Sequence, residues 1–267
     1  MNRVFGDDDL ERLENATYRL LDEVGLKVEH DALEQLLKQS GCRRKADGRF
    51  AIPRSLVREM LDARQGIGTG TPKAQSRHEE ACIDVLFSPG PTSYYDYESG
   101  ETRPTDGEFT RQALAFADAE PRIKRVHALF RPDRAPETGA LEDLVDGLKV
   151  TRKVCPVDAM DPRQVKYLIE ISEIVTGEKG ATEYLGGSQC MHSPLILGNR
   201  SAREMLERKK HGAGEYHVAS MAMMGVQAPL TVGGTVSLAA AECLGGMVVA
   251  HLLLPEARMI GGGACPM

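Results

Sequence analysis

Helical patterns and short apolar runs alternate along the second part of the chain, and this alternation constrains the fold more than any other feature. Five runs follow one another at separations of about 30 to 40 residues, near the roughly 31 residues that each unit of a (β/α)8 barrel occupies. Their centres are Val126, Pro156, Gly187, Ala219 and Ile260. Strands that alternate with helices pair in parallel through right-handed crossovers, so the sequence predicts an α/β fold.

The stretch after the first of these runs separates two parallel architectures. A doubly wound sheet usually carries a glycine-rich phosphate loop after its first strand. Here the stretch reads RPDRAPETG, from Arg131 to Gly139, and has no G-x-G-x-x-G pattern. The sequence therefore favours a TIM-type (β/α)8 barrel, and residues 122–267 hold about five of its βα units. We expect an incomplete barrel that stops after about its fifth strand, as a fragment or a truncated gene product.

The first hundred residues have a different pattern, which predicts a helical extension over residues 1–104 before the barrel over residues 105–267. Apolar residues recur there at helical spacing in three segments, and a strand and a hairpin follow. The five expected elements are a helix over 7–25, a helix that stops at Gly41, a helix over 52–63, a strand over 81–87 and a hairpin over 93–104.

The charge and the cysteines limit the partners and the location of the chain. The formal net charge is -6 and no cluster of Lys and Arg forms a basic stripe, so we expect no nucleic-acid partner. The six cysteines include no C-x-x-C pair, which excludes the common spacing for metal or redox sites. The N-terminus lacks the pattern of a secretory signal, so we expect reduced thiols in a cytoplasmic protein.

One apolar stretch, residues 228–255, is long enough to cross a membrane. It contains Glu242 near its middle, where a carboxylate would be costly in lipid, and it is rich in glycine and alanine. These features predict a buried core helix and no membrane contact. A buried carboxylate needs partners, so we expect Glu242 to bond a nearby loop or a backbone amide.

Candidate site residues follow from the barrel prediction, because barrel enzymes carry their active sites at the carboxyl ends of the strands. An aromatic and acidic cluster, Tyr94 to Tyr97, adds a group suited to a cationic ligand. The candidates for substrate binding are Asp158, Gln189, His192, Ser220, His127 and Tyr95. Other residues near strand ends are Arg131, Ser188, Met221, Met223, Met224, the glycines Gly261 to Gly263, and Cys265.

Several of these residues also have a structural interpretation. His127 would be an internal histidine bonded to a neighbour, Asp158 would cap the next helix, and His192 would fix its loop. The three methionines would fill the core. The sequence contains no recognised metal motif and no nucleophile elbow, so the residues alone leave the reaction unassigned and predict no metal site.

The segment from Ala219 to Gly263 resembles the signature region of the trimethylamine methyltransferase family. The resemblance rests on a set of small, polar and acidic residues: Ser220-Met221, Gly225, Ala228-Pro229 with Thr231, Gly234, and Ala241-Glu242. The turn from His192 to Leu195 is similar to the Ser-Pro-Leu turn of the family. The early segments 20–44 and 52–57 are similar to its opening helices.

This resemblance implies a (β/α)8 barrel with an N-terminal helical extension. It also implies transfer of a methyl group from a methylated amine, either trimethylamine or a quaternary amine such as glycine betaine, to the cobalt of a corrinoid. The corrinoid (a cobalamin) would be carried by a cognate partner protein, so the chain would bind no cofactor directly. We expect the full-length protein to be a homo-oligomer.

Two other interpretations remain open. In the first, the chain is a truncated, non-catalytic fragment of that family. In the second, it is another barrel enzyme, such as a lyase or an aldolase. The latter would require a Schiff-base lysine or metal ligands at strand ends, and the five predicted strands offer neither.

Overall fold

The computed structural model describes residues 5–64, 85–87, 92–127 and 131–263. The chain divides into two compact units, which are treated separately below. Unit 1 comprises Met1–Thr69 and Ser188–Met267, and unit 2 comprises Gly70–Gly187. Helices alternate with short strands that pair mainly in parallel, which confirms the α/β class. Closure into a TIM-type barrel and a domain boundary after residue 104 stay predictions.

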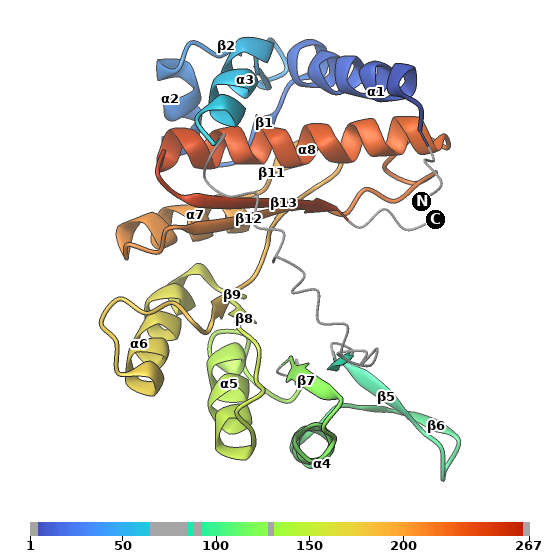
Figure 1. Cartoon of the computed structure of the whole chain (residues 1–267), viewed down its shortest axis with the longest axis vertical. Coiled ribbons are helices and arrows are strands. Elements are labelled where there is room, and N and C mark those ends of the chain that lie inside the picture. Colours follow the sequence, from blue (N-terminus) through green and yellow to red (C-terminus); the bar gives the residue numbers. More distant parts are fainter. Residues whose placement is uncertain (1–4, 65–84, 88–91, 128–130, 264–267) are drawn as a thin grey trace, which may run out of the picture. The chain divides into compact units, whose positions relative to one another are not determined.

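Unit 1 contains the predicted N-terminal helices and the end of the chain (Figure 1). Its helices are α1 (Asp7–Arg19), the π-helical turn η1 (Leu20–Val24), α2 (Asp31–Gln39), α3 (Arg54–Asp62), α7 (Asn199–Lys210) and α8 (Val232–Leu253). Its strands are β1 (Lys27–Val28), β2 (Arg43–Arg44), β3 (Phe50–Ala51), β10 (Gln189–Met191), β11 (Ile196–Leu197), β12 (Glu215–Ser220) and β13 (Arg258–Gly263).

The main sheet of unit 1 is parallel and has the order β10-β12-β13. Alternate residues of β12 are fully buried, and they face α7 and α8. The Tyr216 hydroxyl donates to the carbonyl of Met205 in α7 at 3.1 Å. Two residues later, Val218 lies directly beneath Gly246 of α8. Both helices therefore cover the same face of the sheet, as crossover helices do in parallel folds.

Helix α8 lies between that sheet and the helices α1, α2 and α3 (Figure 1). Two adjacent glycines permit this close packing on both sides. A Cβ atom at Gly245 would lie 3.1 Å from Leu21, and one at Gly246 would lie 2.6 Å from Val218. Among the described helices, α8 alone has the length and composition to cross a membrane. Its burial on two sides makes it the core helix of unit 1, as the sequence predicted.

The described part of unit 2 contains two pairs of parallel strands and one isolated parallel bridge between them. Strand β4 (Val85–Phe87) pairs with β7 (Ile123–Val126), Val126 bridges to Val154, and β8 (Val157–Asp158) pairs with β9 (Leu185–Gly186). The helices are α4 (Gly107–Ala119), α5 (Gly139–Val150), the 3-10 turn η2 (Pro162–Gln164) and α6 (Val165–Thr176). The predicted hairpin is confirmed as β5 (Ser93–Asp96) and β6 (Glu101–Pro104).

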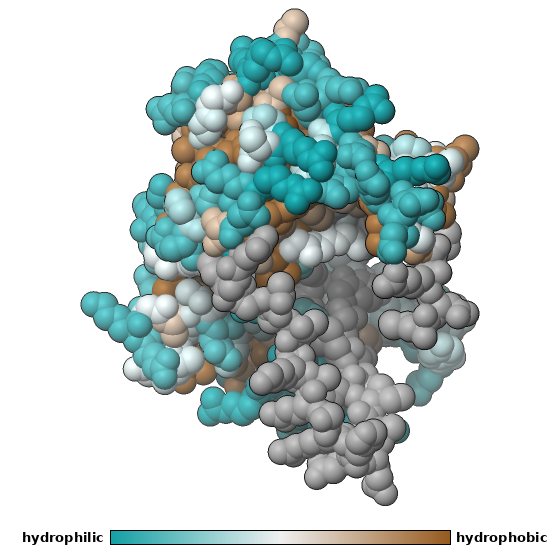
Figure 2. Space-filling view, turned by 45° about the horizontal axis from the view of Figure 1, so that its top comes forward, coloured by the Kyte–Doolittle hydropathy of each residue, from teal (hydrophilic) through white to brown (hydrophobic). Residues whose placement is uncertain are grey.

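The coloured part of the face shown in Figure 2 is mostly polar. Figure 2, in which the part of unit 1 that carries α1 to α3 comes forward, shows hydrophilic residues with apolar residues visible in a few gaps. A mixed surface of this kind is ordinary, because there is too little polar surface to cover a folded protein completely. Three exposed apolar residues, Val226, Leu230 and Val232, lie close together in the sequence just before and at the start of α8.

Candidate functional site

A hydroxyl and an imidazole meet on the face of the unit 1 sheet that is turned away from α7 and α8. We call this the open face. Ser188 Oγ lies 2.8 Å from Nδ1 of His217, within hydrogen-bond distance. His217 stands in β12 between two buried residues, so its half-buried side chain points to the opposite side from theirs. Its neighbours on the open face are Cys190, Ala219, Ile260 and Gly262, which the parallel register brings to this side.

Consecutive glycines of β13 let side chains approach the backbone of this strand closely from both faces of the sheet. A Cβ atom at Gly262 would lie 3.2 Å from Nε2 of His217, and one at Gly261 would lie 3.0 Å from the sulfur of Met247 in α8. The Cys243 thiol of α8 donates to the Gly262 carbonyl at 3.0 Å. The glycine run is thus explained by close approach on both faces of the strand. It leaves the imidazole of His217 beside the backbone of β13.

The Ser188–His217 pair can serve a polar ligand. With Nδ1 engaged by the serine hydroxyl, Nε2 remains on the open face as a donor or an acceptor, according to the tautomer. Neither residue was among the six substrate-binding candidates. Strict alternation along β12 was the pattern that could have revealed His217, because it places residues 217 and 219 opposite Ser220.

Two of the six predicted candidates, Gln189 and Ser220, are fully buried on the helix-covered face. The Gln189 amide donates to Glu204 of α7 at 2.9 Å and accepts from the backbone N–H of His217 at 3.0 Å. The Ser220 hydroxyl donates to Glu242 of α8 at 2.6 Å. These bonds give both side chains structural partners, and the structure does not bring either onto the open face.

His192 lies in the loop after β10 and is exposed. Its backbone forms an antiparallel bridge with Ile196, with N–O distances of 2.8 and 2.9 Å. Its ring packs on Gly198, where a Cβ atom would lie 2.8 Å from Cε1. The predicted partners of Glu242 are confirmed in the same loop, because its carboxylate accepts from the backbone N–H of Leu195 at 2.9 Å.

The other three candidates belong to unit 2 and lie on separate elements. Asp158 ends β8, and its carboxylate lies against Gly187, where a Cβ atom would be 3.1 Å from Oδ1. Asp158 does not cap the next helix, because Asp161 accepts from the N–H of Arg163 there. His127 directly follows β7 and is half-buried. Tyr95, 53% exposed, meets Tyr97 edge to face at 5.0 Å.

The remaining strand-end residues also have definite places. Arg131 pairs with Asp133 at 2.6 Å, and Cys265 lies outside the described residues. The prediction that the methionines fill the core is wrong for Met221 and Met223, which are 52% and 40% exposed. The reason is that the alternation of burial along β12 runs on past Ser220, so that Ala222 takes the buried position and Met221 and Met223 take the exposed ones.

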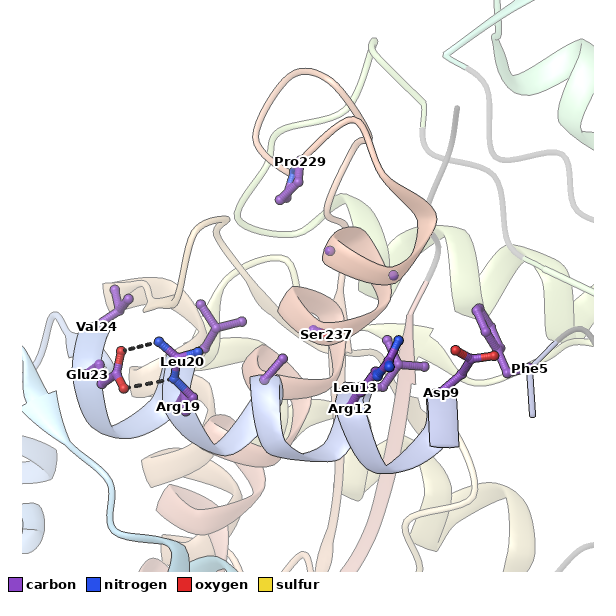
Figure 3. Close-up of a pocket in the computed structure, with 13 residues that line it drawn as sticks. Phe5, Asp9, Arg12, Leu13, Arg19, Leu20, Glu23, Val24, Pro229 and Ser237 are labelled. Atoms are coloured by element: carbon purple, nitrogen blue, oxygen red, sulfur yellow. Dashed lines mark hydrogen bonds and ion pairs between the residues drawn. The ribbon is translucent and has the colours of Figure 1, made fainter. Parts of the chain in front are cut away.

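A second feature of unit 1 is an apolar groove of about 520 Å³ between α1 and the first turns of α8. Figure 3 shows Leu13 of α1 with Leu20 and Val24 of η1 on one side, and Pro229 and Ser237 on the other. The ion pair of Arg19 with Glu23, at 2.9 Å, lies at one end (Figure 3). None of the six predicted candidates lines this groove.

Within the described part of the chain, no group of three or more His, Cys, Asp and Glu side chains is arranged to hold a metal ion. The polar arrangement on the open face is a pair of side chains. It consists of a hydroxyl–imidazole pair beside a glycine strand, with no carboxylate bonded to either group in the structure. Such a site can orient a small polar molecule through one donor or acceptor.

Comparison with known proteins gives a consistent result over nearly the whole chain. The family model described as "Trimethylamine methyltransferase (MTTB)" matches residues 1–265. A glycine betaine methyltransferase of Desulfitobacterium hafniense (strain Y51) is 22% identical over 273 residues, which cover 97% of this chain and 55% of that protein. The trimethylamine methyltransferase MttB of Desulfitobacterium hafniense (strain DSM 10664 / DCB-2) is 21% identical over 271 residues, covering 97% and 54%. The chain thus spans about half the length of these relatives.

Proposed function

The chain belongs to the trimethylamine methyltransferase family, and from this premise we propose that it serves in the transfer of a methyl group from a methylated amine to the cobalt of a corrinoid. The match of the family over residues 1–265 is the observation that carries the proposal. In the proposal the donor is trimethylamine or a quaternary amine such as glycine betaine, and the names of the two relatives support this choice. In the proposal the chain acts in the cytoplasm, as part of a homo-oligomeric enzyme with a TIM-type barrel.

The transfer requires that one carbon–nitrogen bond breaks, that its electron pair stays on nitrogen, and that the methyl group passes to the acceptor. A quaternary amine then leaves as a neutral tertiary amine, whereas trimethylamine must carry a proton on its nitrogen to leave as neutral dimethylamine. A reduced corrinoid, carried by a partner protein, supplies the nucleophile. The work left to this chain is to bind the amine, exclude water and hold the methyl group in line with the acceptor. The open face offers the Ser188–His217 pair for orientation and the glycines of β13 for close approach.

Anaerobic absorbance spectroscopy tests the proposal. The purified chain is mixed with free cob(I)alamin and either glycine betaine or trimethylamine, and the loss of the cob(I)alamin spectrum is followed. We expect transfer from at least one amine. Substitution His217→Ala should lower kcat/KM by about tenfold or more, since an orienting contact of about 1.4 kcal/mol or more is lost. His211→Ala, at the end of α7 and away from the open face, is the matched control and should keep the parental rate.

The alternative is a non-catalytic chain of the same family. It predicts no transfer from either amine by a folded chain, even when a purified corrinoid protein replaces the free cofactor. Circular dichroism identifies the folded state in the same samples. If the parental chain and His217→Ala transfer methyl groups with equal kcat/KM, the proposed reaction stands, but the open face is not part of the site.

A further inference from the structure

We infer that Glu242 is a positioning residue, which fixes the carboxyl ends of two neighbouring strands, β10 and β12, at the border of the open face. Its carboxylate is fully buried in the middle of α8. Three donors converge on it: the Ser193 hydroxyl at 3.0 Å, the Leu195 backbone N–H at 2.9 Å and the Ser220 hydroxyl at 2.6 Å. For the reaction, this inference rests on the proposed function.

The three donors come from two separate parts of the chain, and the buried carboxylate of Glu242 connects these parts. Ser220 is the last residue of β12, whereas Ser193 and Leu195 belong to the loop that follows β10. The same serine is three residues after His217, whose ring bonds Ser188 on the open face. A buried carboxylate is costly unless its lone pairs are satisfied, so its bonds to these donors hold both strand ends in one arrangement.

The loop after β10 carries a second, independent sign of constraint. Leu195 has a φ of +57°, in the left-handed region that residues other than glycine rarely adopt. Backbone held in such a conformation persists only where the surroundings determine it, and such positions cluster at functional sites. Here Glu242 accepts from the N–H of Leu195, while the guanidinium of Arg49 donates to its carbonyl at 3.0 Å.

Arg49 completes the clamp from the N-terminal part of unit 1. Its guanidinium also donates to the carbonyl of Pro194 at 3.3 Å and to the carbonyl of Gly25 at 3.1 Å. The loop is thus bonded to the buried side chain of Glu242 on one side and to the half-buried guanidinium of Arg49 on the other. This arrangement leaves little freedom for the segment from His192 to Leu195, which borders the end of β10.

The chemistry of the clamp makes one substitution a matched control. In Glu242→Gln, the amide oxygen can accept from Leu195 N–H, and the amide nitrogen can donate to both serine hydroxyls, which rotate to accept. In Glu242→Leu, all three bonds are lost. A positioning role therefore predicts that glutamine preserves the arrangement and leucine does not. Ser193→Ala, which removes one donor at a half-buried position, is a milder variant that should still fold.

Hydrogen exchange with mass or NMR detection reads this role without any turnover. In Glu242→Leu, amide exchange at Leu195 and Ile196 should accelerate by about tenfold or more. In Ser193→Ala, the same amides should accelerate to a smaller extent. Exchange at Leu26 and Phe50, which bond each other's backbone in the same unit, should change little. Uniform acceleration at all four amides, or none at the loop, would overturn the inference.

Kinetics then connect the clamp to the reaction. Glu242→Leu should lower kcat for methyl transfer by about tenfold or more with a smaller change in KM, and Glu242→Gln should stay within about threefold of the parental chain. An equal loss in both variants would show that the charge is required, and would overturn the positioning role. If the parental chain transfers no methyl group, the proposed function fails, and the exchange measurement still decides the role of Glu242.

Discussion

A Cβ atom at Gly246 of α8 would lie 2.6 Å from Cγ1 of Val218 in β12. The sulfur of Met191 in β10 would be only 3.1 Å away. Helix and sheet are therefore in contact at a distance that only glycine permits. This one contact fixes how closely α8 approaches two strands that border the open face.

Gly246→Ala should destabilise unit 1, because the added methyl group forces a shift of α8 or of the buried Val218. Overpacking of this kind costs about 1–3 kcal/mol of unfolding free energy. Urea unfolding followed by circular dichroism measures the change. Gly233→Ala is the matched control in the same helix, because its Cβ atom would meet only Leu13 at 3.6 Å, an ordinary contact.

The control should be neutral or slightly stabilising, since alanine has a higher helix propensity than glycine by about 1 kcal/mol. Equal losses in Gly246→Ala and Gly233→Ala would mean that the helix backbone, and not the contact with Val218, decides the outcome. No loss in Gly246→Ala would show that α8 can move away from the sheet freely.

A buried carboxylate in unit 2 predicts a pH dependence of stability. Burial raises the pKa of Asp143 to about 6, against the lowering effect of the charges of Arg134 and Arg131. Since the folded pKa exceeds the unfolded one, the contribution of this group is fully present below about pH 4 and is lost as the pH rises through 6. The parental chain should lose up to about 3 kcal/mol of unfolding free energy over this window through Asp143 alone.

Asp143→Asn should remove this part of the pH dependence. As the pH rises from 4 to 7, the unfolding free energy of the variant should therefore increase relative to that of the parental chain. Urea titrations at intervals of one pH unit measure both curves. Asp146→Asn is the control on the same helix. Burial would raise the pKa of Asp146, but bonds and charge from Arg134 outweigh burial and lower it. The charge of Asp146 is the last of the causes that act on the pKa of Asp143, so its removal should leave most of the Asp143 effect in place. Parallel curves for Asp143→Asn and the parental chain would contradict the prediction.

Local chemistry was predictable from the sequence where one residue carries the information. Asp161 caps η2 and Pro162 begins it, as their types indicate. Glu242 in an apolar helix required buried partners, and it has them. The hairpin with its turn at Gly100 followed from the same kind of local evidence.

The direction of side chains and the long-range packing were not predictable in this way. Ser220 and Gln189 stand near strand ends, but their direction depends on which face the helices cover, and this is a tertiary property. The packing of the N-terminal helices on α8, through Gly245 and Leu21, joins segments more than 200 residues apart. No local pattern encodes such a pairing, so the sequence does not predict that the N-terminal helices pack on α8.

The last prediction concerns the buried ion pair of Glu204 and Arg208 in α7, whose nitrogen and oxygen lie 3.0 Å apart. Burial raises the pKa of Glu204, although the charge and hydrogen bond of Arg208 lower it, as does the amide of Gln189. Arg208→Met should cost about 3–5 kcal/mol of unfolding free energy, because a buried carboxylate loses its bonded cation. Only Arg200 then remains, with a nitrogen 3.7 Å from the carboxylate. The loss should be smaller at low pH, where Glu204 takes up a proton.

The double variant Glu204→Leu/Arg208→Met should recover much of the stability, since an apolar pair needs no compensation. A double variant as unstable as Arg208→Met would instead assign the effect to lost packing of the arginine side chain, and urea unfolding of the three proteins at pH 5 and pH 8 separates the two.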